Sequence, residues 1–267
     1  MTTLLLNSLA AALYLLTGAY LIWTLLQGRE PHRRHLLIAV AVALVVHGIG
    51  VYQLVALPRA IELGFFRVSS LLFWVINAVV LLSSLRKPLH NLFILLLPLS
   101  ALGIIASLLG RNASGHPLVL DYTLAGHVLL SILAYSLLTI ATLQALLLAW
   151  QNHQLKHRHP TGRVRLLPPL QTMEALLFEL LWAGHLALTL SIISGFVFLD
   201  DLFAQHLAHK TVFSLAAWVI YSVLLGGRHY LGWRGYTAIR WTLGGFLLLM
   251  LAYFGSKLVL ELILGAV

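Results

Sequence analysis

Eight apolar runs, each about as long as a lipid bilayer requires of a spanning helix, occupy most of this 267-residue sequence. Only 9% of the residues are charged, whereas a water-soluble domain has about a quarter, and the mean hydropathy is +0.94. A chain of this length has too few polar residues to cover so much apolar surface in water. The sequence therefore excludes a disordered chain, a secreted disulfide scaffold and a water-soluble enzyme.

The runs predict an all-α fold, a single polytopic membrane domain covering residues 1–267. The first run is not expected to be a cleaved signal peptide, because no basic residue precedes it and its apolar stretch is too long. Pro98, inside the fourth run, is expected to bend that helix, and the small residues at 191–196 and 244–246 favour close helix packing. The expected transmembrane helices cover residues 4–27, 35–57, 65–85, 89–110, 122–150, 176–199, 209–227 and 236–262.

Charged residues between the runs predict the direction of the chain. Twelve of the 17 Lys and Arg residues lie in or beside the gaps after the first, third, fifth and seventh runs, and five lie on the opposite side. Because cytoplasmic connections are enriched in Lys and Arg, both termini are expected outside. The longest connection, 151–175, is then cytoplasmic. The scattered basic residues form no concentrated face, which argues against nucleic acid as a partner.

The chain contains no cysteine, so disulfides, thiolate nucleophiles, iron–sulfur clusters and cysteine zinc sites are excluded. The sequence also has no nucleophile elbow, P-loop, zinc-protease motif or dinucleotide fingerprint. Its acidic residues form no relay inside the runs, which argues against a proton-driven pump. A protein that is not an enzyme is the expectation.

Four histidines fall within or at the edge of the runs, where ionisable side chains are costly and are candidates for function. A neutral imidazole binds metals and ligates haem iron. By depth the four form two pairs, one near the outer surface and one near the middle of the membrane. The outer pair is His127 and His209, and the inner pair is His47 and His185. The alternative for each is a histidine that hydrogen-bonds to a neighbouring helix.

Other polar groups have plainer interpretations. Glu179 is expected at the cytoplasmic interface, and His153 and His157 are expected in a solvated basic connection. Asp200, Asp201, His206 and His209 form an outer cluster that either holds a divalent cation or is an ordinary polar connection; we expect no metal site there.

Residues 209–255 resemble the end of the membrane domain of the cytochrome c assembly family, the haem handlers related to CcsA and CcmC. Residues 127–138 resemble the family helix that begins with an outward-facing histidine, and the stretch LPPLQTME at 167–174 also fits. The resemblance covers about half of the chain. It rests on AW at 217–218, Tyr221, GWRG at 232–235, GGF at 244–246 and YFG at 253–255.

This resemblance implies an eight-span protein of the bacterial cytoplasmic (inner) membrane that binds haem, with His127 as the best match to the family's outer ligand. The chain departs from the family at two places. The tryptophan-rich outer motif is replaced by FLDDLFAQHLAHKT at 198–211, and Gly226 stands where the family has an inner histidine.

Two functions therefore remain open. The first is a membrane haem-binding protein of the cytochrome c assembly type, which holds or passes haem through its histidines and leaves covalent attachment to other maturation proteins. The second is a non-catalytic partner or regulator of another membrane protein, such as a metal-ion transporter, that has lost haem handling. Lipid bilayer is a partner in both.

Overall fold

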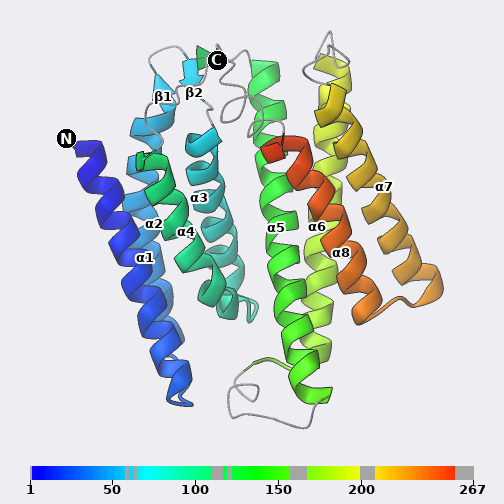
Figure 1. The fold of residues 1–267 in the computed structure, drawn as a ribbon, viewed down its shortest axis with the longest axis horizontal. Coiled ribbons are helices and arrows are strands. Elements are labelled where there is room, and N and C mark those ends of the chain that lie inside the picture. The colour runs from blue at the N-terminus through cyan, green and yellow to red at the C-terminus, as the bar shows by residue number, and fades with distance from the viewer. Residues whose placement is uncertain are drawn as a thin grey trace. The chain divides into compact units, whose positions relative to one another are not determined.

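The computed structural model describes residues 2–57, 60–62, 65–109, 117–118, 122–156, 167–198 and 208–255. Within this part of the chain, eight helices are long and apolar enough to cross a membrane, which confirms the predicted helical membrane class (Figure 1). The chain divides into two compact units, which we describe separately. The first comprises Met1–Val119 and His153–Pro168, and the second comprises Leu120–Asn152 and Pro169–Val267.

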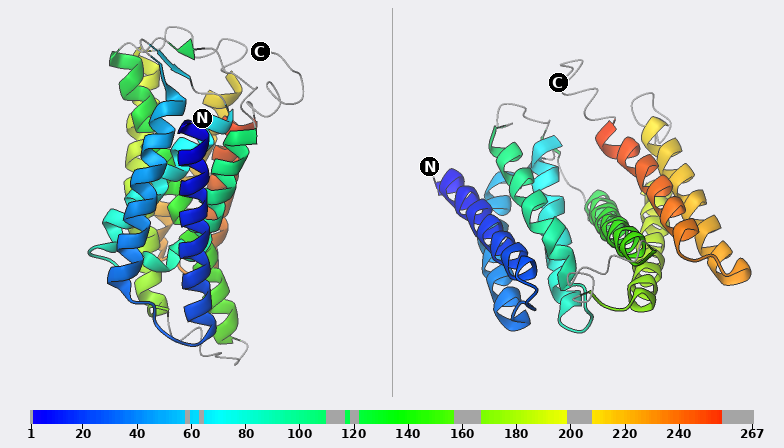
Figure 2. Two further views of the ribbon diagram at one scale, coloured as in Figure 1. Left: turned by 90° about the vertical axis from the view of Figure 1, so that its left-hand side faces the viewer. Right: turned by 60° about the horizontal axis from the view of Figure 1, so that its bottom comes forward.

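The first unit is a bundle of four helices, seen in Figures 1 and 2 in blue to green. The helices pack in a closed ring, in which α1 contacts α2 and α4, and α3 contacts the same two helices. A 3-10 turn, His90–Leu92, precedes the last helix. The four helices are α1 (Thr2–Leu26), α2 (Arg33–Val55), α3 (Phe65–Ser84) and α4 (Phe93–Leu109).

Pro98 lies inside α4, as predicted. Gly18 of α1 packs against this point: a Cβ built on Gly18 would lie 3.4 Å from the Leu97 Cβ and 3.7 Å from the Pro98 Cδ. The absence of a side chain at Gly18 therefore lets α1 lie close to α4 where the proline ring interrupts the regular hydrogen bonding.

A small antiparallel sheet, which the sequence did not predict, also belongs to the first unit. Its order is β1-β2-β3, and the paired residues include Ala56 with Ile61 and Ile61 with Leu118. The strands have only two or three residues each, too few for a periodic sequence signal. They are β1 (Ala56–Leu57), β2 (Ala60–Glu62) and β3 (Pro117–Leu118).

The second unit contains the other four helices. Helix α7 contacts both α6 and α8. Tyr135 of α5 lies 5.8 Å, between ring centroids, from Phe246 of α8. A π-helical turn, Leu251–Gly255, follows the last helix. The helices are α5 (Tyr122–Lys156), α6 (Leu170–Phe198), α7 (Ala208–Leu231) and α8 (Tyr236–Met250).

Glycines allow the close packing that the sequence predicted in this unit. A Cβ on Gly245 of α8 would lie 2.9 Å from the Tyr221 ring of α7, and a Cβ on Gly184 of α6 would lie 2.7 Å from the Leu138 Cδ2 of α5. A larger residue at Gly245 would collide with the Tyr221 ring, and one at Gly184 would require the Leu138 side chain to move.

The predicted connection 151–175 is wrong at both ends, because α5 continues to Lys156 and α6 begins at Leu170. Hydropathy marks the part of a helix that lies in lipid, whereas backbone hydrogen bonding continues into water. The last predicted helix, 236–262, is helical as far as Met250 and continues as the π-helical turn, and its remaining residues lie outside the described part of the chain.

Candidate functional site

His127 lies in the second turn of α5 and points toward α6. Its Nδ1 atom lies 3.1 Å from the Ser191 carbonyl oxygen and 3.0 Å from the Ser194 Oγ. A carbonyl oxygen only accepts, so Nδ1 must carry the proton and donate it. The other nitrogen of the neutral ring, Nε2, then carries the lone pair. It makes no hydrogen bond to a residue that the structure describes.

Hydroxyl groups fix this part of the helix pair. Ser194 Oγ donates to the Ser191 carbonyl at 2.8 Å, and Ser131 Oγ donates to the His127 carbonyl at 2.8 Å. The hydroxyls of Ser131 and Ser191 also lie 2.7 Å apart. These bonds join α5 and α6 across the histidine and hold its ring in one orientation.

His127 lines a cavity of about 180 Å³ that α5, α6 and α7 form together. Ser131, Ser191 and Ser214 contribute hydroxyl groups, and Lys210 contributes a cation near the amino end of α7. The amino end of a helix carries partial positive charge, so this wall favours an anionic group. Leu188 and Phe196 are among the apolar lining residues.

Haem is the group that the family resemblance implied, and the His127 ring has a hydrogen-bonding pattern that would suit a ligand of haem iron. A ligating histidine typically donates its second ring N–H to a carbonyl or carboxylate, which fixes the ring and leaves the other nitrogen for the metal. Ser191 supplies such a carbonyl. At about 180 Å³ the cavity is below the roughly 300 Å³ at the small end of ligand sites, so it is too small to enclose a whole porphyrin.

The sequence predicted His209 as the outer partner of His127, and the structure describes only its backbone. His209 is the second residue of α7, at the same end of the helix as Lys210, but its side chain lies outside the described part of the structure. Asp200, Asp201, His206 and His157 also lie outside it. Among the residues described, no group of three or more His, Asp or Glu side chains is arranged to hold a metal ion.

His185, a residue of α6, packs against α7. Its ring stacks on Trp218 with a centroid distance of 5.6 Å, and its Nε2 lies 3.3 Å from the Ser222 Oγ. Trp218 Nε1 in turn donates to Thr189 Oγ1 at 2.8 Å. These contacts favour a histidine that connects two helices.

His47 is completely buried within the first unit. Its Nδ1 lies 3.2 Å from the Tyr14 hydroxyl of α1, and its Nε2 lies 3.0 Å from the Ser70 Oγ of α3. Both ring nitrogens are therefore hydrogen-bonded, which favours the alternative of a core histidine over a ligand. The predicted pair of His47 and His185 joins residues of different units and stays a prediction.

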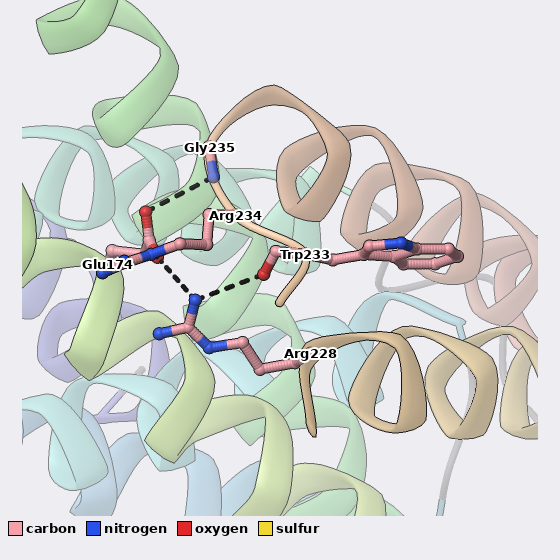
Figure 3. Close-up of polar contacts among 5 residues, drawn as sticks. All are labelled: Glu174, Arg228, Trp233, Arg234 and Gly235. Atoms are coloured by element: carbon pink, nitrogen blue, oxygen red, sulfur yellow. Dashed lines mark hydrogen bonds and ion pairs between the residues drawn. The ribbon is translucent and has the colours of Figure 1, made fainter. Parts of the chain in front are cut away.

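The buried carboxylate of Glu174 joins three helices at the end of the second unit away from the His127 cavity (Figure 3). The predicted connection 151–175 included this residue. The Glu174 side chain is only 8% exposed, and its Oε1 accepts hydrogen bonds from Arg228 Nη1 and Arg234 Nε, both at 3.0 Å. Its Oε2 accepts the Gly235 N–H at 3.3 Å. One carboxylate of α6 thus binds both the end of α7 and the start of α8.

The GWRG motif at 232–235 is the turn that this carboxylate holds. Gly232 and Gly235 have φ angles of 68° and 54°, a backbone conformation that other residues rarely adopt. The Trp233 carbonyl accepts a hydrogen bond from Arg228 Nη1 at 3.2 Å. A Cβ on Gly227 would lie only 2.4 Å from the Trp233 ring. Two stretches of the family resemblance, 167–174 and 232–235, therefore meet in space.

The remaining candidates lie on the surface. Glu179, expected at the cytoplasmic interface, is exposed on α6, nine residues after the helix begins at Leu170. His153 is also exposed, in the last turn of α5, and not in a connection.

The fold and this site define a polytopic helical membrane protein with a histidine presented to a cavity between three helices. The sequence model described as cytochrome c assembly protein matches residues 35–264. The chain therefore belongs to the cytochrome c assembly protein family.

Its relatives include the inner membrane protein YpjD of Escherichia coli K12, which is 31% identical over 96% of this chain and 97% of the relative. An uncharacterized 28.8 kDa protein from Azospirillum brasilense, encoded in a nifR3-like 5' region, is 35% identical over 52% of each chain. No solved structure is significantly similar to this chain.

Proposed function

We propose that this protein binds haem in the bacterial inner membrane, holding or passing it at the cavity beside His127, and that it does not itself form covalent bonds to haem. Membership of the cytochrome c assembly family supports the cofactor, and the name of the Escherichia coli relative supports the membrane. The observation that carries the proposal is the His127 ring, whose Nδ1 is committed to Ser191 and whose Nε2 is not.

Three residues at the cavity, His127, Ser191 and Lys210, have roles in this proposal. His127 would ligate the iron through Nε2, and the Ser191 carbonyl would keep the ring in the required tautomer. Lys210 and the amino end of α7 favour a carboxylate, the charged group at the propionate edge of haem. His209, two residues into α7, is the proposed second ligand. Bound iron would supply a coloured, redox-active centre.

The proposed orientation places both termini outside, so that the cavity opens toward the outer face of the membrane. The excess of Lys and Arg on the other side supports it, with twelve of the 17 basic residues there. Haem delivered or held at this face would be accessible to maturation proteins that act outside the cytoplasm.

The test is an absorption spectrum of the protein purified in mild detergent from cells supplied with haem precursor. A Soret band in the wild type that is lost in His127→Ala, with normal protein yield, is the expected result. His153→Ala is a matched control, because it removes an exposed histidine from the other end of the same helix. Wild-type protein without a Soret band would contradict the proposal.

A second candidate function is a non-catalytic partner of another membrane protein. The size of the cavity, about 180 Å³, favours it over a complete porphyrin site. Absence of the Soret band, together with co-purification of a second membrane protein after mild solubilisation, would support this alternative.

A further inference from the structure

A dense group of cationic side chains lies at one end of the first unit. Two connections supply it, the one between α1 and α2 and the one between α3 and α4. The two stretches, residues 27–36 and 84–92, contain a single carboxylate, that of Glu30. The group, which we call the basic cluster, consists of Arg29, Arg33, Arg34, Arg86 and Lys87.

The two connections converge in space. Arg33 Nη2, at the start of α2, donates to the carbonyl oxygens of Ser84 at 2.5 Å and Leu85 at 3.0 Å, at the end of α3. Charges from two separate parts of the sequence therefore form one surface.

This surface has the amphipathic character of a lipid-binding site. The side chains of Arg29, Arg34 and Arg86 are exposed. On the contacting helices α2 and α3, four residues along the chain from Arg34 and Arg86, Ile38 is 52% exposed and Leu82 is 67% exposed. A molecule bound here meets positive charge at the helix ends and apolar surface along the helices.

The corresponding arginines of the second unit are arranged differently. Arg228 and Arg234 both bind the carboxylate of Glu174, so their charge is largely balanced within the protein. In the first unit, Arg33 donates to backbone carbonyls, and the two stretches contain five Lys and Arg residues and one carboxylate.

We propose that the basic cluster binds the phosphate headgroup of an anionic phospholipid whose acyl chains lie along α2 and α3. Basic groups between transmembrane helices at the cytoplasmic side attract anionic headgroups, and the attraction grows with each Lys or Arg at the surface. The exposed apolar side chains of Ile38 and Leu82 add contacts that inorganic phosphate cannot make. The proposal is independent of haem binding.

Native mass spectrometry of the detergent-purified full-length protein tests this, after incubation with equal amounts of phosphatidylglycerol and phosphatidylcholine. The main variant combines Arg29→Gln, Arg34→Gln, Arg86→Gln and Lys87→Gln. Arg33 is retained because it binds the end of α3. The matched control removes four cations from another connection: Lys156→Gln, Arg158→Gln, Arg163→Gln and Arg165→Gln. A third variant, Arg29→Lys, Arg34→Lys and Arg86→Lys, preserves the charge.

The wild type, the matched control and the lysine variant are expected to retain phosphatidylglycerol in preference to phosphatidylcholine. The preference should fall about tenfold or more in the main variant. An unchanged preference in the main variant, or an equal fall in the matched control, would overturn the proposal. Displacement of phosphatidylglycerol by millimolar inorganic phosphate would also overturn it, since the ligand would then be a free anion.

Discussion

His47 in the first unit and His127 in the second are both histidines within membrane-spanning helices, yet their surroundings differ in one decisive respect. Side chains from two other helices, Tyr14 of α1 and Ser70 of α3, occupy both nitrogens of His47. His127 is held at Nδ1 by Ser191, and its ring lines a cavity. The role of a membrane histidine therefore depends on whether its second ring nitrogen is hydrogen-bonded. The depth of the residue in the membrane does not reveal this.

The first prediction concerns the orientation of the chain, which decides the face of the membrane at which the His127 cavity lies and whose outcome is all-or-none. With both termini outside, a reporter active only in the periplasm should work when fused after Val267, and a cytoplasmic reporter should not. Fusions at Pro160 should give the opposite result. An external signal at Pro160 would place the His127 cavity at the cytoplasmic face.

The second prediction separates the two histidines directly. If haem binds as proposed, His127→Ala should lower the haem content about tenfold or more and change or abolish the Soret band, because the iron would lose a protein ligand. The absorption spectrum and the amount of protein in the membrane would be measured together. Wild-type spectrum, abundance and phenotype in His127→Ala would remove the strongest support for haem binding and favour the partner-protein alternative.

These contrasts show what the sequence alone could predict. Apolar length and charge predicted eight helices, because the bilayer constrains each helix separately. The places of His47 and His127 within the runs predicted that both lie in membrane-spanning helices, as they do. The partners of each ring did not follow, because they come from residues 23 to 67 positions away along the chain.

Glu174 was missed for a related reason. It precedes the apolar run of α6, so hydropathy placed it in a connection, although its side chain is buried against two arginines. The sequence signal for this contact lay in two stretches, 167–174 and 232–235. Both resemble the family, but nothing in either stretch shows that the two contact each other.

The third prediction tests whether this buried carboxylate is mainly structural. Glu174→Gln should destabilise the second unit by about 2 kcal/mol, because Arg228 loses its carboxylate partner while Arg234, largely exposed, regains solvent. Thermal unfolding in detergent measures the loss. Any bound haem should keep a wild-type spectrum in the protein that remains folded, and a shifted Soret band would connect this end of the unit with the histidine site.

The fourth prediction applies to the first unit and has a smaller expected effect. His47→Gln should lower stability by about 1 kcal/mol, since one of the two hydrogen bonds, to Tyr14 or Ser70, is lost within the helix bundle. The same thermal unfolding measurement applies, with the absorption spectrum as the second readout. If the Soret band disappears in this variant, His47 is a ligand and the contrast with His127 fails.

The smallest effect is expected from the histidines at the far end of α5. His153 is exposed in the last turn of this helix, and His157 and His159 follow in a basic stretch of the sequence. Replacing all three with Gln should leave protein abundance, haem content and thermal stability at wild-type values, because exposed polar substitutions rarely change stability by more than about 0.5 kcal/mol. Metal content, measured by mass spectrometry, should also be unchanged. A loss of bound metal in this triple variant would show that a second histidine site exists, and His127 would then not be the sole candidate ligand on α5.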